Sequence, residues 1–87
     1  MSSTYTKEQV VKIIGDITSP YVGDAVGRNA GDHFWKRLGL DDDKINADDM
    51  ERLLGQLSKG LKVFLGEAKA AGVTGEVREA IREGGRS

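Results

Sequence analysis

The sequence contains no cysteine, one proline and one histidine, and only 6% of its 87 residues are aromatic. Without cysteine the chain can form neither a disulfide nor a reactive thiolate, which is typical of proteins in a reducing compartment. Residues 1–5 lack the basic and apolar stretches of a signal peptide. No apolar run approaches the roughly 20 residues needed to span a bilayer. We therefore expect a cytoplasmic location and no membrane partner.

The scarcity of histidine and cysteine also bears on catalysis. The single histidine, His33, directly follows Asp32, and neighbouring residues on a helix point about 100° apart. The two side chains therefore cannot pair as a base and the group that orients it. No serine or threonine has a partner that would activate it, and no carboxylate pair stands out. We expect no enzymatic activity, no catalytic residue and no cofactor.

The acidic segment 41–51 is similar to the second half of a calcium-binding EF-hand loop. In that register Leu38 and Leu40 occupy positions that require oxygen ligands, and Asp49 stands where a bidentate glutamate belongs. The comparison excludes a standard metal site and predicts a solvated loop. A weak divalent-cation-binding or small-ligand-binding helical domain remains an alternative. It would need a buried pocket that contains His33 or a cluster of the aspartates, and the sequence does not place one.

Charged residues make up 31% of the chain, but the formal net charge is only −1. A dedicated nucleic-acid-binding domain usually has a strong basic excess, so the composition argues against a nucleic-acid partner. The basic residues near the end, Lys69, Arg78, Arg82 and Arg86, are interpreted as a solvated face. A helix-turn-helix-like nucleic-acid-binding regulator is the alternative function. In that regulator the predicted 20–38 and 47–71 helices would form the motif. The acidic segment 41–51 at the start of the 47–71 helix would repel phosphates.

Apolar residues, 38% of the chain, recur at helical spacing and predict an all-α fold. No segment shows the alternation of a strand. The expected fold is an irregular bundle of three main helices plus a short C-terminal helix, at about 7–18, 20–38, 47–71 and 75–83. A single domain would cover residues 1–83, and residues 84–87 would form a frayed tail.

Residues typical of helix ends set these boundaries. A capping box covers 6–9, and Ser19-Pro20 supplies an N-cap followed by a proline suited to the first helical position. Gly39 and Gly72 are typical stop residues. Asn46 is expected to cap the third helix. That helix has the strongest apolar stripe in the chain.

Two further expectations concern the burial of the residue before the predicted 47–71 helix and the continuity of that helix. Ile45, just before the cap, is expected to be a buried plug in an otherwise polar connection. Gly55, Gly60 and Gly66 could kink or divide the helix.

Gly23, Gly27 and Gly31 lie four residues apart within the predicted 20–38 helix. Each glycine inside a helix costs about 0.8–1.0 kcal/mol relative to alanine, so the three cost roughly 3 kcal/mol. Residues four apart share one helix face, and glycine there lets another backbone approach closely. We interpret the three glycines as a helix-packing surface, either inside the domain or between two copies of it.

Tyr21, Arg28 and Trp35 are spaced by seven residues and would form a row along the same helix. Aromatic and arginine side chains are enriched at binding hot spots. These three residues are therefore the candidate partner-binding residues, with Trp35 foremost. The alternative is that the first or last helix covers them.

One pattern resembles a known group of proteins. It consists of Tyr-Val-Gly at 21–23, Leu-Gly-Leu at 38–40, Ile45, and Gly-Leu-Lys-Val-Phe-Leu-Gly at 60–66. The pattern is similar to small helical accessory modules found beside bacterial signalling and kinase domains, over about 19–66. The resemblance implies an accessory or oligomerising role and names no catalytic residue.

Together these features predict a non-catalytic protein–protein interaction or self-association module, in bacterial signalling or regulation. The expected partner is another protein or a second copy of the chain. A small core and a helix with a glycine face both favour a C₂ homodimer. A monomer that binds a different protein remains open.

Overall fold

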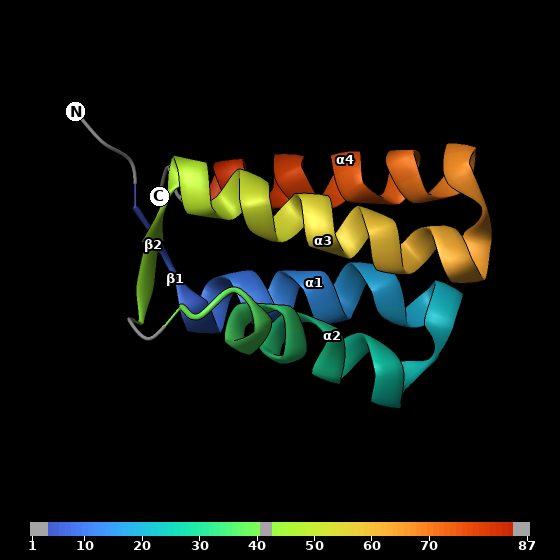
Figure 1. Ribbon diagram of the computed structural model, residues 1–87, viewed down its shortest axis with the longest axis horizontal. Coiled ribbons are helices and arrows are strands. Elements are labelled where there is room, and N and C mark those ends of the chain that lie inside the picture. Colours follow the sequence, from blue (N-terminus) through green and yellow to red (C-terminus); the bar gives the residue numbers. More distant parts are fainter. Residues whose placement is uncertain (1–3, 41–42, 85–87) are drawn as a thin grey trace.

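The computed structural model describes residues 4–40 and 43–84. Within these residues the chain forms four helices and a two-stranded sheet, and the helices lie as two hairpins, α1 with α2 and α3 with α4 (Figure 1). The elements are β1 (Thr4–Thr6), α1 (Lys7–Val22), α2 (Asp24–Arg37), β2 (Lys44–Asn46), α3 (Ala47–Leu65) and α4 (Glu67–Gly84). The predicted all-α class is confirmed, whereas several predicted boundaries differ.

Helix α1 begins where the capping box predicts and ends later than expected. Thr6 Oγ1 accepts a hydrogen bond from the Gln9 N–H at 3.3 Å. The helix then continues through Pro20 to Val22, so the predicted break between 18 and 20 is wrong. Pro20 lies in the last turn, where its missing N–H removes only one helical hydrogen bond. The turn is completed because the Gly23 N–H donates to Ser19 O at 2.8 Å.

The corner between α1 and α2 lies at Gly23. Its φ of 93° belongs to a region that glycine adopts without strain and that other residues rarely enter. A Cβ added to Gly23 would meet nothing within 4 Å. Gly23 is therefore the turn residue, and the predicted 20–38 helix is replaced by the shorter α2.

A second corner divides the long helix predicted at 47–71. Gly66, with φ 83°, ends α3, and α4 continues from Glu67 through Gly72 to Gly84. The last helix is therefore a full-length element of 18 residues instead of a short segment at 75–83. An unbroken helix would have carried Val73, Val77 and Ile81 away from the core, whereas the corner places all three inside it.

The short sheet joins the chain start to the entry of α3, and the sequence did not predict it. β1 and β2 are antiparallel, with Tyr5 opposite Ile45. Both of these side chains are buried, so the expected burial of Ile45 is confirmed. Three residues per strand are too few to show an alternating pattern. The tail predicted at 84–87 lies, apart from Gly84, outside the described residues.

The apolar core is supplied mainly by α1, α3 and α4. Its buried members are Tyr5, Val10, Ile14, Trp35, Ile45, Met50, Leu53, Leu54, Leu57, Leu61, Ala70, Val73, Val77 and Ile81. Of these, only Trp35 comes from α2. Helix α2 instead packs extensively on α1 and only sparsely on α3.

Glycines permit the contact between α1 and α2. A Cβ added to Gly27 would lie 2.9 Å from the backbone N and Cα of Ser19, and one added to Gly31 would lie 3.1 Å from Val11 Cα. From the opposite helix, a Cβ on Gly15 would lie 3.5 Å from Gly27 O. Gly27 and Gly31 thus lie against α1 within the domain, and Gly23 does not take part.

We predict opposite effects of alanine at two helical glycines. Gly27→Ala should lower the free energy of unfolding by about 1–3 kcal/mol, because backbone atoms of Ser19 would have to move. The matched control Gly55→Ala should raise it by about 0.5–1 kcal/mol, since nothing lies within 4 Å and alanine favours the helix. Urea denaturation followed by circular dichroism measures both changes. Equal stabilisation by the two substitutions would contradict the close α1–α2 contact.

Candidate functional site

An apolar groove lies between α2 and α3. It has a volume of about 400 Å³ and is also bordered by the end of α1. Its lining residues are Thr18, Val22, Ala25, Val26, Asn29, Ala30, His33, Phe34, Leu57, Gly60, Leu61 and Phe64. We call this set the α2–α3 groove.

The groove follows from how α2 is held. The glycine contacts bring α2 close to α1, and its contact with α3 is sparse. Phe34 lies across the gap, with its ring over the bare backbone of Gly60. A Cβ on Gly60 would lie 3.0 Å from Phe34 Cζ. The lining residues come from both helical hairpins, α1 and α2 on one side and α3 on the other.

Large apolar side chains remain exposed around this groove. Phe64 is 62% exposed and Val26 is 45% exposed, and both line it. Val63 and Tyr21 are also exposed, and each directly precedes a lining residue in the chain without lining the groove itself. Contiguous exposed apolar surface on a small protein marks interaction or ligand-binding sites.

Few polar groups face the groove, and with His33 neutral no lining residue carries a charge. Thr18 Oγ1 donates to Ile14 O at 2.6 Å, and Asn29 Nδ2 donates to Ala25 O at 2.8 Å. The His33 ring meets the Phe34 ring edge-on, with centroids 5.3 Å apart. These groups could orient a bound molecule, but they do not form a nucleophile–base pair.

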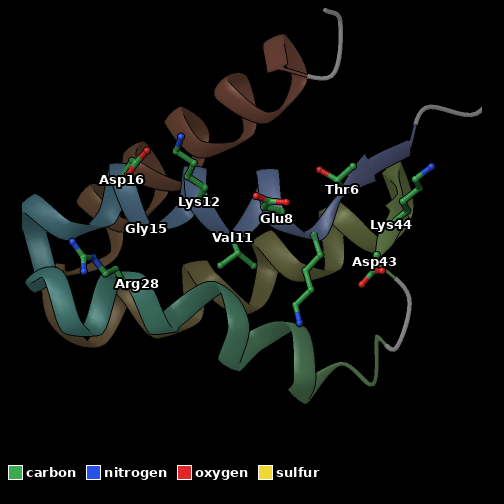
Figure 2. A pocket seen from close by; sticks show the side chains of 10 residues that line it. Thr6, Glu8, Val11, Lys12, Gly15, Asp16, Arg28, Asp43 and Lys44 are labelled. Carbon is green, nitrogen blue, oxygen red and sulfur yellow. The ribbon is translucent and has the colours of Figure 1, made fainter.

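A larger hollow of about 710 Å³ lies beside α1, α2 and the strands (Figure 2). Its lining mixes positive side chains (Lys7, Lys12, Arg28 and Lys44) with negative ones (Glu8, Asp16 and Asp43). Figure 2 shows these groups spread along the two helices and the strand end instead of converging on one point. The mixed, dispersed charge favours no single class of ligand.

The structure separates the three predicted partner-binding residues. Tyr21 lies on the last turn of α1, and Arg28 lies exposed on α2. Trp35 is 1% exposed and belongs to the core, with Lys7 Nζ 5.9 Å from its ring centroid. The prediction that Trp35 contacts a partner at the surface is therefore wrong. The row of three does not exist, because the corner at Gly23 puts Tyr21 on a different helix.

Three of the apolar lining residues lie on helix faces that the sequence predicts to be apolar. Val26 and Phe34 belong to the apolar face of the predicted 20–38 helix, and Phe64 belongs to the stripe of the third helix. An apolar stripe has the same spacing whether or not another element covers it. No signal in the sequence could therefore have marked Phe64 as exposed.

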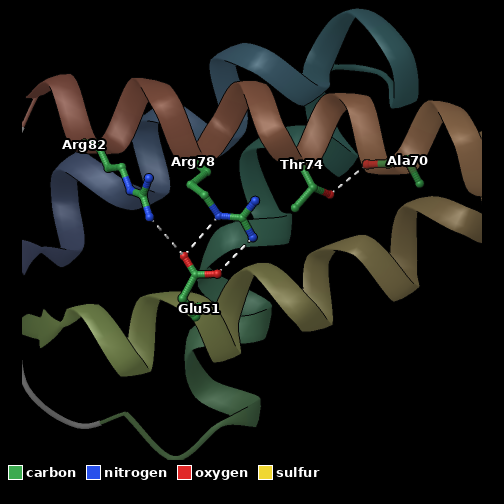
Figure 3. Close-up of polar contacts among 5 residues, drawn as sticks. All are labelled: Glu51, Ala70, Thr74, Arg78 and Arg82. Atoms are coloured by element: carbon green, nitrogen blue, oxygen red, sulfur yellow. Dashed lines mark hydrogen bonds and ion pairs between the residues drawn. The ribbon is translucent and has the colours of Figure 1, made fainter.

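Ion pairs join the two helices of each hairpin at positions outside the groove lining. Asp32 on α2 contacts Lys7 Nζ at 3.2 Å and Lys36 Nζ at 3.3 Å. Glu51 on α3 makes a bidentate contact with Arg78 on α4, at 2.9 and 3.0 Å, and Arg82 lies nearby (Figure 3). Among the described residues, no ion pair links α2 to α3.

Two kinds of feature are absent from the part of the chain that the structure describes. It contains no group of three or more His, Cys, Asp or Glu side chains that could hold a metal ion. None of its helices is long and apolar enough to cross a membrane. The surface features that remain to be explained are the apolar groove and the scattered charges.

The pKa of Asp32 provides a test of the α1–α2 arrangement. Hydrogen bonds from Lys7 and then Lys36 lower this pKa from its ordinary value of 3.8. The stabilisation is therefore fully present above pH 3.8 and is lost as the pH falls through the lower, folded-state pKa. We expect Asp32→Asn to be less stable than the wild type at neutral pH. This deficit should vanish in strong acid.

Urea denaturation of both proteins over a series of pH values measures this difference. The carboxyl carbon of Asp32 should also titrate below 3.8 in an NMR experiment. A stability difference that is the same at every pH would rule out the Lys7–Asp32–Lys36 contacts.

Comparison with known proteins identifies no relative of this chain. No family model, curated protein or solved structure matches the chain. Its function therefore has to be argued from the groove, the exposed side chains around it and the charges elsewhere on the surface.

Proposed function

We propose that this protein is a non-catalytic protein–protein interaction module and that the α2–α3 groove is its contact surface. The observation that carries the proposal is Phe64, an aromatic side chain left 62% exposed at the edge of an apolar groove. Burying such a side chain stabilises a complex by about 1.5–3 kcal/mol. Aromatic residues in fully desolvated pockets are typical binding hot spots, although tryptophan, tyrosine and arginine dominate them.

The groove also indicates the chemistry of the partner. It lies between two helices, which is the geometry in which an amphipathic helix docks through its apolar face. Since the lining is uncharged, affinity would come from apolar burial and would depend little on salt. An accessory role without catalysis is also what the resemblance to modules beside bacterial signalling and kinase domains implies.

The ligand-binding alternative is met only in part. It requires a buried pocket that contains His33, and His33 lines the groove but is itself exposed. The volume of about 400 Å³ falls within the range of about 300–1,000 Å³ of small-molecule sites. Binding of neutral aromatic fragments, with NMR shifts confined to His33, Phe34 and Phe64, would favour this function.

The nucleic-acid alternative gains no such support. Arg78 and Arg82, two of the basic residues near the end of the chain, both lie against Glu51. Their charge is partly neutralised, and α3 begins with Asp48 and Asp49 in its first turn. Phosphates would be repelled from that helix end.

A selection of helical peptides tests the proposed function. A displayed library of amphipathic peptides is panned against the purified protein. Enriched peptides should carry apolar anchors at i, i+3, i+4 and i+7. They should bind Phe64→Asp at least about 30-fold more weakly than the wild type, since a hot-spot truncation costs about 2 kcal/mol or more.

Val63→Asp is the matched control for this selection. Val63 is the neighbouring residue on α3 and is 83% exposed, but it does not line the groove. Peptide affinity should change little in this variant. If no peptide is enriched, or if both variants bind as the wild type does, the groove is not an interaction surface.

A further inference from the structure

We infer that the partner of the α2–α3 groove is a second copy of this chain, joined by a twofold axis that crosses the groove. This inference rests on the proposed function, because it names the occupant of the same surface. A protein partner must offer an apolar helical face with no unpaired charge. The chain itself carries such a face, formed by Val26 on α2 and Phe64 on α3.

The absence of charged side chains from the groove lining favours a second copy as the partner. In a twofold contact, residues near the axis meet the same residues of the other copy, so a charged residue there faces its own charge. The groove lining contains no aspartate, glutamate, lysine or arginine, and His33 is its only titratable residue. Two copies can therefore meet along this groove without repulsion between like charges.

Two other described faces differ in this respect. The outer face of α3 and α4 carries Glu51, Arg78 and Arg82, whose side chains already contact one another (Figure 3). The hollow beside α1 carries lysines and acidic residues together (Figure 2). A twofold axis through either face would bring together charged groups that are now solvated.

The shape of the surface also fits a second copy. It holds a hollow of about 400 Å³ and, in the lining of that hollow, the exposed aromatic ring of Phe64. A twofold operation places the ring of each copy over the groove of the other. The interface is thereby self-complementary, and both copies bury their exposed Phe64 in the apolar lining near Phe34 and Gly60.

The small size of the chain also favours association. A chain of 87 residues buries a smaller share of its surface than a larger domain does. Small scaffolds commonly add stability by oligomerising. Here α2 supplies one fully buried residue, Trp35, to the core, and its groove face leaves Val26 45% exposed.

Sedimentation equilibrium over a wide concentration range tests the inference. The wild type should be a dimer with a Kd below about 1 mM. Phe64→Asp and Val26→Asp should each weaken dimerisation by at least about 100-fold, because each dimer contains the change twice. Val63→Asp, outside the groove lining, should dimerise within a few-fold of the wild type.

Folding of the variants is checked by circular dichroism and urea denaturation, and both altered side chains are at least 45% exposed in the folded chain. The absence of cysteine allows a second, independent test. A spin label attached to Val63→Cys in unlabelled protein should broaden amide signals of Gly60, Leu61 and His33 in a mixed, isotope-labelled sample. The same label at Ala71→Cys, exposed on α4, should not.

The possible failures are distinct. A wild type that stays monomeric at about 1 mM overturns the second copy as partner, and the peptide selection still decides separately whether the groove binds proteins. A dimer that Phe64→Asp does not weaken overturns the groove as its interface. Broadening from the Ala71 label alone would place the interface on α4 and overturn the inference as well.

Discussion

The close approach of α2 to α1 is the constraint on which the rest of the structure depends. At Gly27 and Gly31 the backbone of α2 lies where a Cβ would collide with or crowd α1. Gly15 provides the matching gap on α1. Dispersion attraction between the two closely packed helices offsets the low helix propensity of glycine. A side chain at Gly27 or Gly31 would push the two helices apart, whereas a Cβ at Gly15 would make an ordinary contact.

This constraint determines how α2 meets the remaining helices. Because α2 is drawn onto α1, it inserts a single side chain, Trp35, fully into the core and leaves a gap toward α3. Phe34 spans the gap by resting on Gly60. The groove thus lies where α2, held against α1 at its glycines, meets α3 only sparsely.

Ion pairs also join the two helices within each hairpin. Lys7 and Asp32 join α1 to α2, and Glu51 and Arg78 join α3 to α4 (Figure 3). Each pair is partly exposed and contributes little to stability by itself. The lining of the α2–α3 groove, in contrast, contains no aspartate, glutamate, lysine or arginine. That absence of charge is what makes an apolar contact with another surface feasible there.

The sequence by itself determined the helical class, the helix starts at Thr6 and Asn46, and the burial of Ile45, because capping and apolar spacing act over a few neighbouring residues. The sequence also contains the glycines of both corners, Gly23 and Gly66. A glycine can continue a helix or end it, however, and only packing against the core selects the positive φ. Only the tertiary structure decided that Trp35 is buried and Phe64 is exposed. The reason is physical: helical spacing defines a face, whereas exposure depends on which other helix lies against it.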